Sequence, residues 1–151
     1  MKKFRYSMES LFEIKQKLEE QAKAAYAAAK MRLSEEEGRL LALQKKREAY
    51  IEEQREVMSH FIFVPKLNAL QIAVDTTDER IQRQKQNVRK AEMAVRAAEE
   101  RLIDSMTERK TQERLRENAF EEYKQEMNAE EQKEVDERTS FQYGRSNTEE
   151  A

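Results

Sequence analysis

Residues 59–68 read SHFIFVPKLN and contain the only proline of the 151-residue chain, Pro65. A proline disfavours the helical conformation in the residue before it, here Val64, and is well suited to the first turn of a new helix. On both sides of this stretch, apolar residues recur every three or four positions, as in helices that pack together. The stretch therefore predicts a single connection between two long helices.

The composition of the chain favours helices and excludes most other folds. Charged residues make up 40% of the sequence, which contains two Gly and no Cys or Trp, whereas ordinary domains carry roughly 25% charged residues and about 7% Gly. Two glycines cannot supply the turns of a β-rich domain or a phosphate-binding loop. Without Cys there is no disulfide framework and no thiolate metal site. We therefore expect an all-α fold.

The apolar residues define a stripe on each predicted helix. After Pro65 the stripe follows a heptad spacing: Leu67, Leu70, Val74, Thr77, Ile81, Gln84, Val88, Ala91, Val95, Ala98 and Leu102. Before it, similar steps run from Leu40 to Phe61, preceded by an eleven-residue rhythm at Leu11, Ile14, Leu18, Ala22, Ala25, Ala29 and Leu33. An eleven-residue repeat relaxes the usual supercoil, so we expect a straight segment there.

Such long helices cannot bury their own apolar stripes, so the two should fold back on each other as a long antiparallel two-helix coiled-coil hairpin. A turn centred on Phe63 and Val64 would place Ala29 opposite Ala98, and Phe4 opposite Tyr123. The expected boundaries are helix one over about 5–61, a turn at 62–65, helix two over about 66–138, a single domain over 1–138 and a disordered polar tail at 139–151.

Charge is unevenly distributed although the net charge is only -2. Residues 80–116 contain eleven Lys and Arg against six Asp and Glu, whereas residues 117–137 contain two against nine. Glutamates interrupt the basic segment and no aromatic residues are interleaved for base stacking, so we expect no nucleic-acid binding. No apolar run approaches the roughly 20 residues of a membrane span. We therefore expect a cytoplasmic protein.

The sequence offers no catalytic or metal-binding constellation. The only histidine is His60, so a nucleophile would lack a base elsewhere in the chain, and no second imidazole exists to share a metal. We expect no enzymatic activity, no cofactor and no metal. The apolar run at the N-terminus, which includes Phe4, Tyr6 and Phe12, is wider than a two-helix seam requires. It is either additional core or a docking surface for another protein.

Motifs at the two ends of the chain resemble one known family. The sequence reads FRYSMESLFEIK at 4–15, ERLRENAFEEY at 113–123 and EEQKEVDE at 130–137. These segments are similar to the opening and the C-terminal signature of the flagellar export protein FliJ family, and the likeness covers nearly the whole chain. The resemblance implies an antiparallel coiled coil similar to the shaft subunit of rotary ATPases.

The resemblance also implies a function and partners. Members of the family are components of the flagellar type III export apparatus that bind the hexameric export ATPase, the export-gate membrane protein FlhA and export chaperones. The chain would be monomeric alone and associated with the membrane at the flagellar base only through partners. The implied ATPase contacts are Phe4, Tyr6, Leu11, Phe120 and Tyr123, and the implied gate contacts are Leu43 and Tyr50. At the gate face, Lys46, Ala73 and Thr77 depart from the family pattern.

Two other interpretations share this helical pattern. One is the equivalent stalk of a virulence-type secretion system, which would differ only in its partners. The other is a generic homodimeric coiled-coil scaffold, in which the helices of two chains pair with each other.

Overall fold

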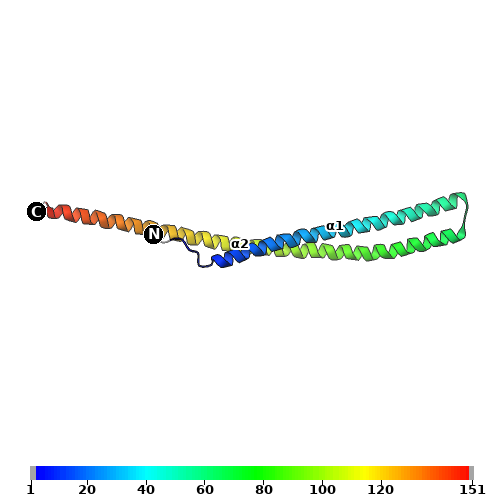
Figure 1. Ribbon diagram of the computed structural model, residues 1–151, viewed down its shortest axis with the longest axis horizontal. Helices are drawn as coiled ribbons and strands as arrows, with labels where there is room; N and C mark the ends of the chain where they lie inside the picture. The colour runs from blue at the N-terminus through cyan, green and yellow to red at the C-terminus, as the bar shows by residue number, and fades with distance from the viewer. Residues whose placement is uncertain (1–2, 150–151) are drawn as a thin grey trace. The chain divides into compact units, whose positions relative to one another are not determined.

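The computed structural model describes residues 3–149, and the side chains of residues 3–147. Two helices, α1 (Glu9–His60) and α2 (Val64–Glu149), include nearly all of these residues, and no strand occurs among them. The helices pack against each other as a hairpin (Figure 1), so the predicted all-α antiparallel fold is confirmed.

The first helix begins later than the sequence predicts, at Glu9 instead of about residue 5. Cations near a helix N-terminus oppose the helix dipole, whereas a carboxylate is favourable there. Lys3 and Arg5 accordingly lie outside the helix, and Glu9 occupies its first turn. The Phe12 N–H donates to the carbonyl of Met8 at 3.0 Å, which closes that first turn.

The connection comprises residues 61–63 and is shorter than the predicted turn at 62–65. The N–H groups of Lys66 and Leu67 both donate to the carbonyl of Phe63 at 3.1 Å, so Phe63 caps α2. Pro65 is then in the first helical turn, where a missing N–H costs no hydrogen bond. From Val64 onward α2 continues without a break.

The described residues form two compact units, each containing part of both helices. The turn unit consists of residues 19–105, and the terminal unit consists of residues 3–18 together with 106–149. The expectation of a single domain over 1–138 remains a prediction.

In the turn unit, the heptad spacing predicted for the second helix is confirmed. Its most buried residues are Leu70, Val74, Thr77, Ile81, Gln84, Val88 and Ala91. The facing residues of α1 follow the same spacing and are Glu19, Ala22, Tyr26, Ala29, Leu33, Glu36, Leu40, Leu43, Arg47, Tyr50, Gln54 and Val57, all buried or half-buried. The buried residues of both helices therefore follow the seven-residue period throughout this unit.

The predicted eleven-residue rhythm in the first helix is wrong. Ala25 is exposed and Tyr26 is the half-buried position, while in the terminal unit Ile14 and Leu18 are exposed and Lys15 is half-buried. The reason is that a helix must keep the period of the helix it packs against. The buried residues of α2 follow a heptad spacing. The residues of α1 that pack against them therefore follow the same spacing, even where their side chains are polar.

The shorter turn also changes which residues face each other. Hydrogen bonds join Arg47 to Asp78, Gln54 to Gln71 and Gln84 to Glu36. Ala29 lines a groove with Ala91 and Ala94, whereas the predicted turn placed it opposite Ala98. The partners of Arg47 and Gln54 on α2 thus lie two residues closer to its N-terminus than predicted, and the partner of Glu36 lies seven residues closer.

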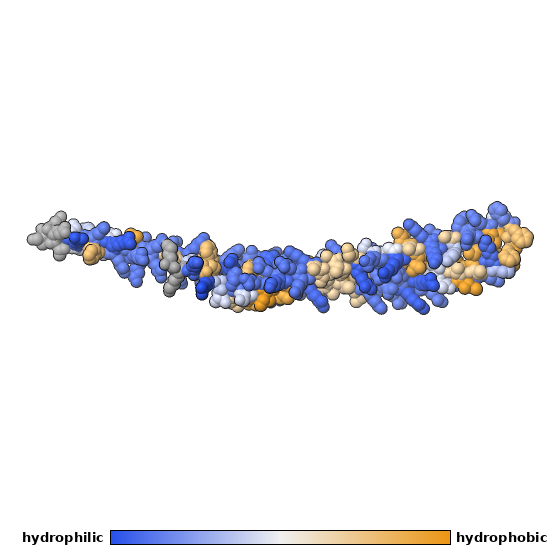
Figure 2. Space-filling model, viewed as in Figure 1, coloured by the Kyte–Doolittle hydropathy of each residue, from blue (hydrophilic) through white to orange (hydrophobic). Residues whose placement is uncertain are grey.

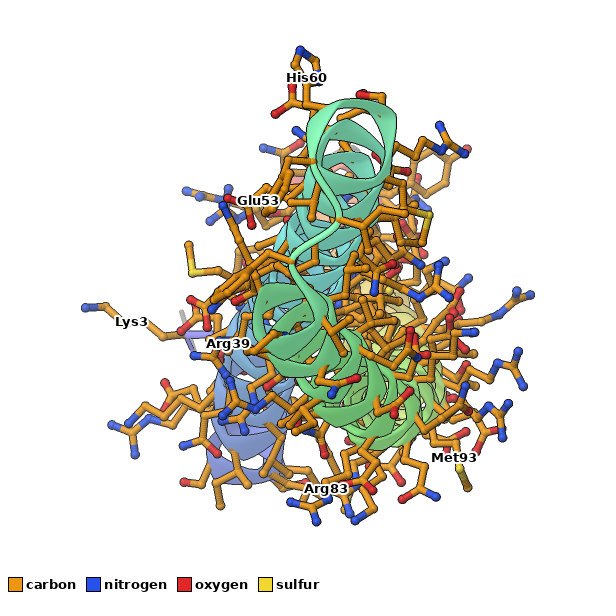
Figure 3. The ribbon with its side chains drawn as sticks, turned by 90° about the vertical axis from the view of Figure 1, so that its right-hand side faces the viewer. Lys3, Arg39, Glu53, His60, Arg83 and Met93 are labelled. Atoms are coloured by element: carbon orange, nitrogen blue, oxygen red, sulfur yellow. The ribbon has the colours of Figure 1, made fainter. Side chains whose placement is uncertain are left out.

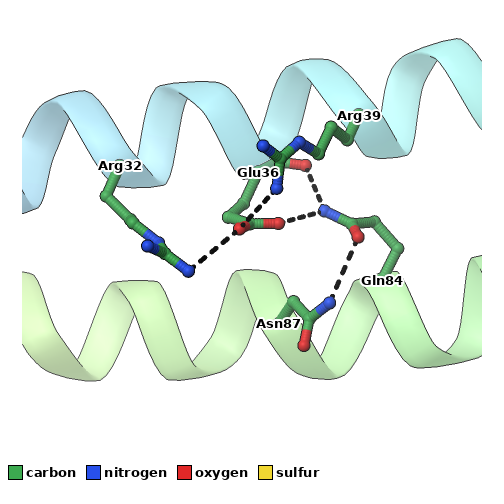
Figure 4. A network of polar contacts seen from close by, with 5 residues as sticks. All are labelled: Arg32, Glu36, Arg39, Gln84 and Asn87. Carbon is green, nitrogen blue, oxygen red and sulfur yellow. Dashed lines mark hydrogen bonds and ion pairs between the residues drawn. The ribbon is translucent and has the colours of Figure 1, made fainter.

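A buried polar network crosses the seam of the turn unit at Glu36 (Figure 4). The Gln84 side-chain amide donates to both the backbone carbonyl of Glu36, at 2.8 Å, and its carboxylate. Arg39 and Arg32 lie 3.1 and 3.6 Å from the other carboxylate oxygen. Because a displaced register would separate Glu36 from Gln84 and break the two hydrogen bonds that cross the seam, the network favours a single register.

The second helix continues through the segment predicted to be disordered. Residues 139–149 belong to α2, so the predicted tail is wrong up to Glu149, and residues 150 and 151 lie outside the described part of the chain. No proline interrupts this segment. Each residue added to an existing helix forms one further hydrogen bond, and the unfavourable nucleation step is not repeated. Residues 128–147 are all exposed and form an acidic overhang of the terminal unit.

Replacing Gln84 alone should destabilise the protein more than replacing the whole polar pair. We expect Gln84→Leu to lower the free energy of unfolding by about 1–3 kcal/mol, because the buried carboxylate of Glu36 loses a donor. Adding Glu36→Leu should restore most of this loss, since two packed apolar side chains need no partners. Urea denaturation measures both values.

The matched control for this prediction is Gln86→Leu, at an exposed position of the same helix. Its free energy of unfolding should stay within about 0.5 kcal/mol of the unmodified protein. A double variant less stable than Gln84→Leu alone would contradict the proposed role of the pair.

Candidate functional site

An aromatic cluster joins the N-terminal segment to α2 in the terminal unit. The Phe4 ring meets the Phe120 ring edge-on at a centroid distance of 5.0 Å and the Tyr123 ring at 5.4 Å. Phe120 and Tyr123 are separated by 6.2 Å. Aromatic pairs in such geometries contribute stability beyond their buried area. The cluster therefore fixes a non-helical segment against the helix, and the predicted pairing of Phe4 with Tyr123 is confirmed.

Polar contacts extend this attachment along the terminal unit. The Tyr6 hydroxyl donates to the side-chain oxygen of Gln112 at 3.5 Å. The Arg116 guanidinium donates to Glu9 at 2.8 Å and lies over the Phe12 ring at 5.7 Å. These contacts do not follow from the apolar pattern of the sequence, although the opposite charges of Glu9 and Arg116 are visible in it.

A groove of about 370 Å³ lies between the N-terminal segment and α2. Its lining includes Lys3 and Arg5 from the N-terminal segment and three glutamates from α2. The full lining is Lys3, Phe4, Arg5, Tyr6, Ser7, Ala119, Glu122, Tyr123, Glu126, Met127 and Glu130. The lining of the groove thus combines aromatic residues with charged residues of both signs.

The cluster is part core and part accessible surface. Phe4, Tyr6 and Tyr123 are half-buried, and Phe120 is 39% exposed. Leu11, the fifth residue assigned to this end, is half-buried and lies on the first turn of α1 rather than among the three rings. One face of the N-terminal apolar run therefore packs on α2 as additional core, and its use as a docking surface stays a prediction.

The residues assigned to the gate contact belong to the turn unit. Leu43 and Tyr50 are half-buried at the seam, with Lys46 exposed between them. Thr77 is only 4% exposed and its hydroxyl donates to the carbonyl of Ala73 at 2.7 Å. Thr77 is therefore part of the seam between the helices and is not a surface residue.

The connection between the helices exposes a second apolar surface. Phe61, Ile62, Phe63 and Val64 are each more than half exposed, and Figure 2 shows apolar residues gathered at this end of the turn unit. His60 points away from the helix pair (Figure 3), and its Nδ1 lies 2.8 Å from the Ser59 hydroxyl. No group of three potential metal ligands occurs among the described residues.

Truncating Phe4 should test whether the aromatic cluster holds the N-terminal segment. We expect Phe4→Ala to lower the free energy of unfolding by about 1–3 kcal/mol while the far-ultraviolet circular dichroism remains nearly unchanged, since Phe4 precedes α1. The matched control is Phe61→Ala, because that ring is 77% exposed and should cost little. Equal losses in the two variants would show that the cluster has no special role.

Comparisons with known proteins identify the family. The family model described as flagellar FliJ protein matches residues 4–148. No curated protein and no solved structure shows a significant match to the chain. Within the described residues, neither helix contains a stretch of the length and hydropathy that a bilayer span requires. Because the match includes nearly the whole sequence and both of its end motifs, the chain belongs to the flagellar FliJ protein family.

Proposed function

We propose that this chain is a non-enzymatic component of the flagellar type III export apparatus that binds the hexameric export ATPase through its paired helix ends. Membership of the FliJ family implies a flagellar export component. The proposed action is to promote assembly and activity of the ATPase ring and to connect it with the export gate and export chaperones. The proposed location is the cytoplasmic side of the membrane at the flagellar base, reached through partners only.

The aromatic cluster is the observation that supports binding at the helix ends. Aromatic side chains are enriched among the residues that contribute most to protein interfaces. Phe4, Tyr6 and Phe120 are held in place by contacts within the terminal unit, so a partner would not have to order them. The neighbouring overhang is an exposed acidic helix, which suits a ring lined with basic residues.

Stimulation of the ATPase tests this proposal. Purified chain should raise phosphate release by the cognate export ATPase several-fold and release none by itself. The double variant Tyr6→Ala/Phe120→Ala should lose most of the stimulation, because it removes an anchor from each side of the terminal unit. Circular dichroism establishes that the variant is still folded.

The matched control is Phe61→Ala/Phe63→Ala, which removes two exposed rings from the turn unit. It should stimulate the ATPase like the unmodified chain. Docking through the helix ends is refuted if the control loses stimulation to the same extent, and ATP hydrolysis by the chain alone refutes a non-enzymatic role.

We further propose that Leu43 and Tyr50 contribute to binding of the export gate. Tyr50→Ala should weaken binding to the purified cytoplasmic part of FlhA several-fold while leaving ATPase stimulation unchanged, because the two contacts use different units. Isothermal titration calorimetry measures the affinity. Lys46→Ala serves as the neighbouring exposed control, and an unchanged affinity for Tyr50→Ala would remove this residue from the gate surface.

A further inference from the structure

We propose that a cationic groove on the turn unit binds an acidic helical segment of a partner protein. The groove lies between α1 and α2 and has a volume of about 510 Å³. Its apolar lining is formed by Ala28, Ala29, Ala91 and Ala94, and its polar lining by Arg32, Glu36, Arg39, Asn87 and Lys90. We call this surface the alanine groove. It lies in the turn unit and serves a contact beyond the proposed binding of the ATPase.

The net charge of the alanine groove is positive at its surface. Arg32 and Arg39 have side chains that are 72% and 64% exposed, whereas the only carboxylate of the lining, Glu36, has a side chain that is 5% exposed. That carboxylate already accepts hydrogen bonds from Gln84 and Arg39. A ligand at the mouth of the groove therefore meets guanidinium groups and not the carboxylate.

The positive charge continues along α2 beyond the groove. Arg83, Lys90 and Arg101 are separated by seven and eleven residues, which are close to two and three helical turns, so the three positions share one side of the helix. All three are exposed, and within the described part of the chain none of them forms an ion pair. Figure 3 shows Arg83 at the edge of the helix pair, pointing outward.

Some cations of α1 in the same unit are paired with carboxylates, whereas Lys30, Lys45 and Lys46 of that helix form no ion pair within the described residues. Lys23, Arg47 and Arg55 each have a carboxylate partner, on their own helix or across the seam. Like charges gathered on one face repel each other, and a partner that brings carboxylates relieves this repulsion. Charge complementarity therefore points to an acidic ligand on this side of α2.

The apolar lining indicates what kind of acidic ligand fits. Four alanines give the groove a shallow apolar floor on which an apolar side chain of a helix can rest, as in other helix-in-groove complexes. A helix carrying glutamates two turns apart would place them beside Arg83 and Lys90. The lining contains no aromatic ring on which bases could stack and no bulky apolar side chain that could enter a bilayer. The surface therefore suits a protein helix better than a nucleic acid or a lipid.

Binding of a defined peptide to the full chain tests the proposal. The probe is a fluorescein-labelled 21-residue helical peptide of Glu, Ala and Leu with leucines at heptad spacing, and its affinity is measured by fluorescence anisotropy. The same peptide with Lys in place of Glu should not bind. Raising the ionic strength should weaken the interaction, since charges at an exposed surface are screened by salt.

The decisive comparison uses two variants with the same change in charge. Arg83→Glu/Lys90→Glu alters the side of α2 that faces the alanine groove, whereas Arg89→Glu/Arg96→Glu alters two exposed residues, also seven positions apart, on the opposite flank. The first variant should bind the peptide about tenfold more weakly, and the second should stay within about twofold of the unmodified chain. Circular dichroism verifies that both remain helical.

Three outcomes would overturn the proposal. The first is absence of peptide binding, and the second is an equal loss of affinity in the two variants, which would indicate attraction to the total charge of the chain. The third is tighter binding of a 21-nucleotide oligothymidylate or of vesicles containing phosphatidylserine than of the peptide. In that case the cations of α2 serve a nucleic acid or a membrane surface.

Discussion

The fold depends on one narrow seam, because each helix can bury only a single stripe of side chains against the other. The buried apolar residues of the described chain are Leu70, Val74, Ile81, Val88 and Ala91, and none of its side chains is completely buried. With so little apolar area removed from water, the two stripes must coincide along their whole common length. The shared heptad period satisfies this requirement, since it keeps both stripes in contact from turn to turn.

The same seam explains why polar residues occupy interior positions. Glu36 and Gln84 lie where the heptad requires a side chain to point inward, and they satisfy each other by hydrogen bonds. Polar pairs of this kind add little stability, but they make alternative registers costly. The alanines beside them leave space between the helices, and that space is the alanine groove. The residues in this part of the seam therefore determine both the register of the two helices and the position of the groove.

We expect partners to bind where the seam between the helices ends or opens, because the side chains there are not covered by a second helix. The aromatic cluster of the terminal unit is partly exposed, and the acidic overhang is exposed over residues 128–147. The apolar residues of the connection are exposed for the same reason. The accessible surfaces of these segments are therefore the places where we expect partners to bind.

The sequence by itself determined the helical class, the position of the turn near Pro65 and the meeting of Phe4 with Tyr123. These features follow from local propensity, from the heptad stripe of the second helix and from counting residues outward from the turn. Its two end motifs also identified the family. The contact of Phe120 with Phe4 could not be predicted, because it depends on how the non-helical segment around Phe4 lies against α2.

Only the tertiary structure decided which residues of the first helix face inward. In the sequence, Ala25, Ile14 and Leu18 look like core positions, whereas Lys15 and Glu36 look like surface positions. The structure reverses these assignments because the period of a helix in a coiled coil is set by its partner and not by its own apolar residues. It likewise decided that residues 139–149 are helical, since an established helix extends at little cost even through a polar sequence.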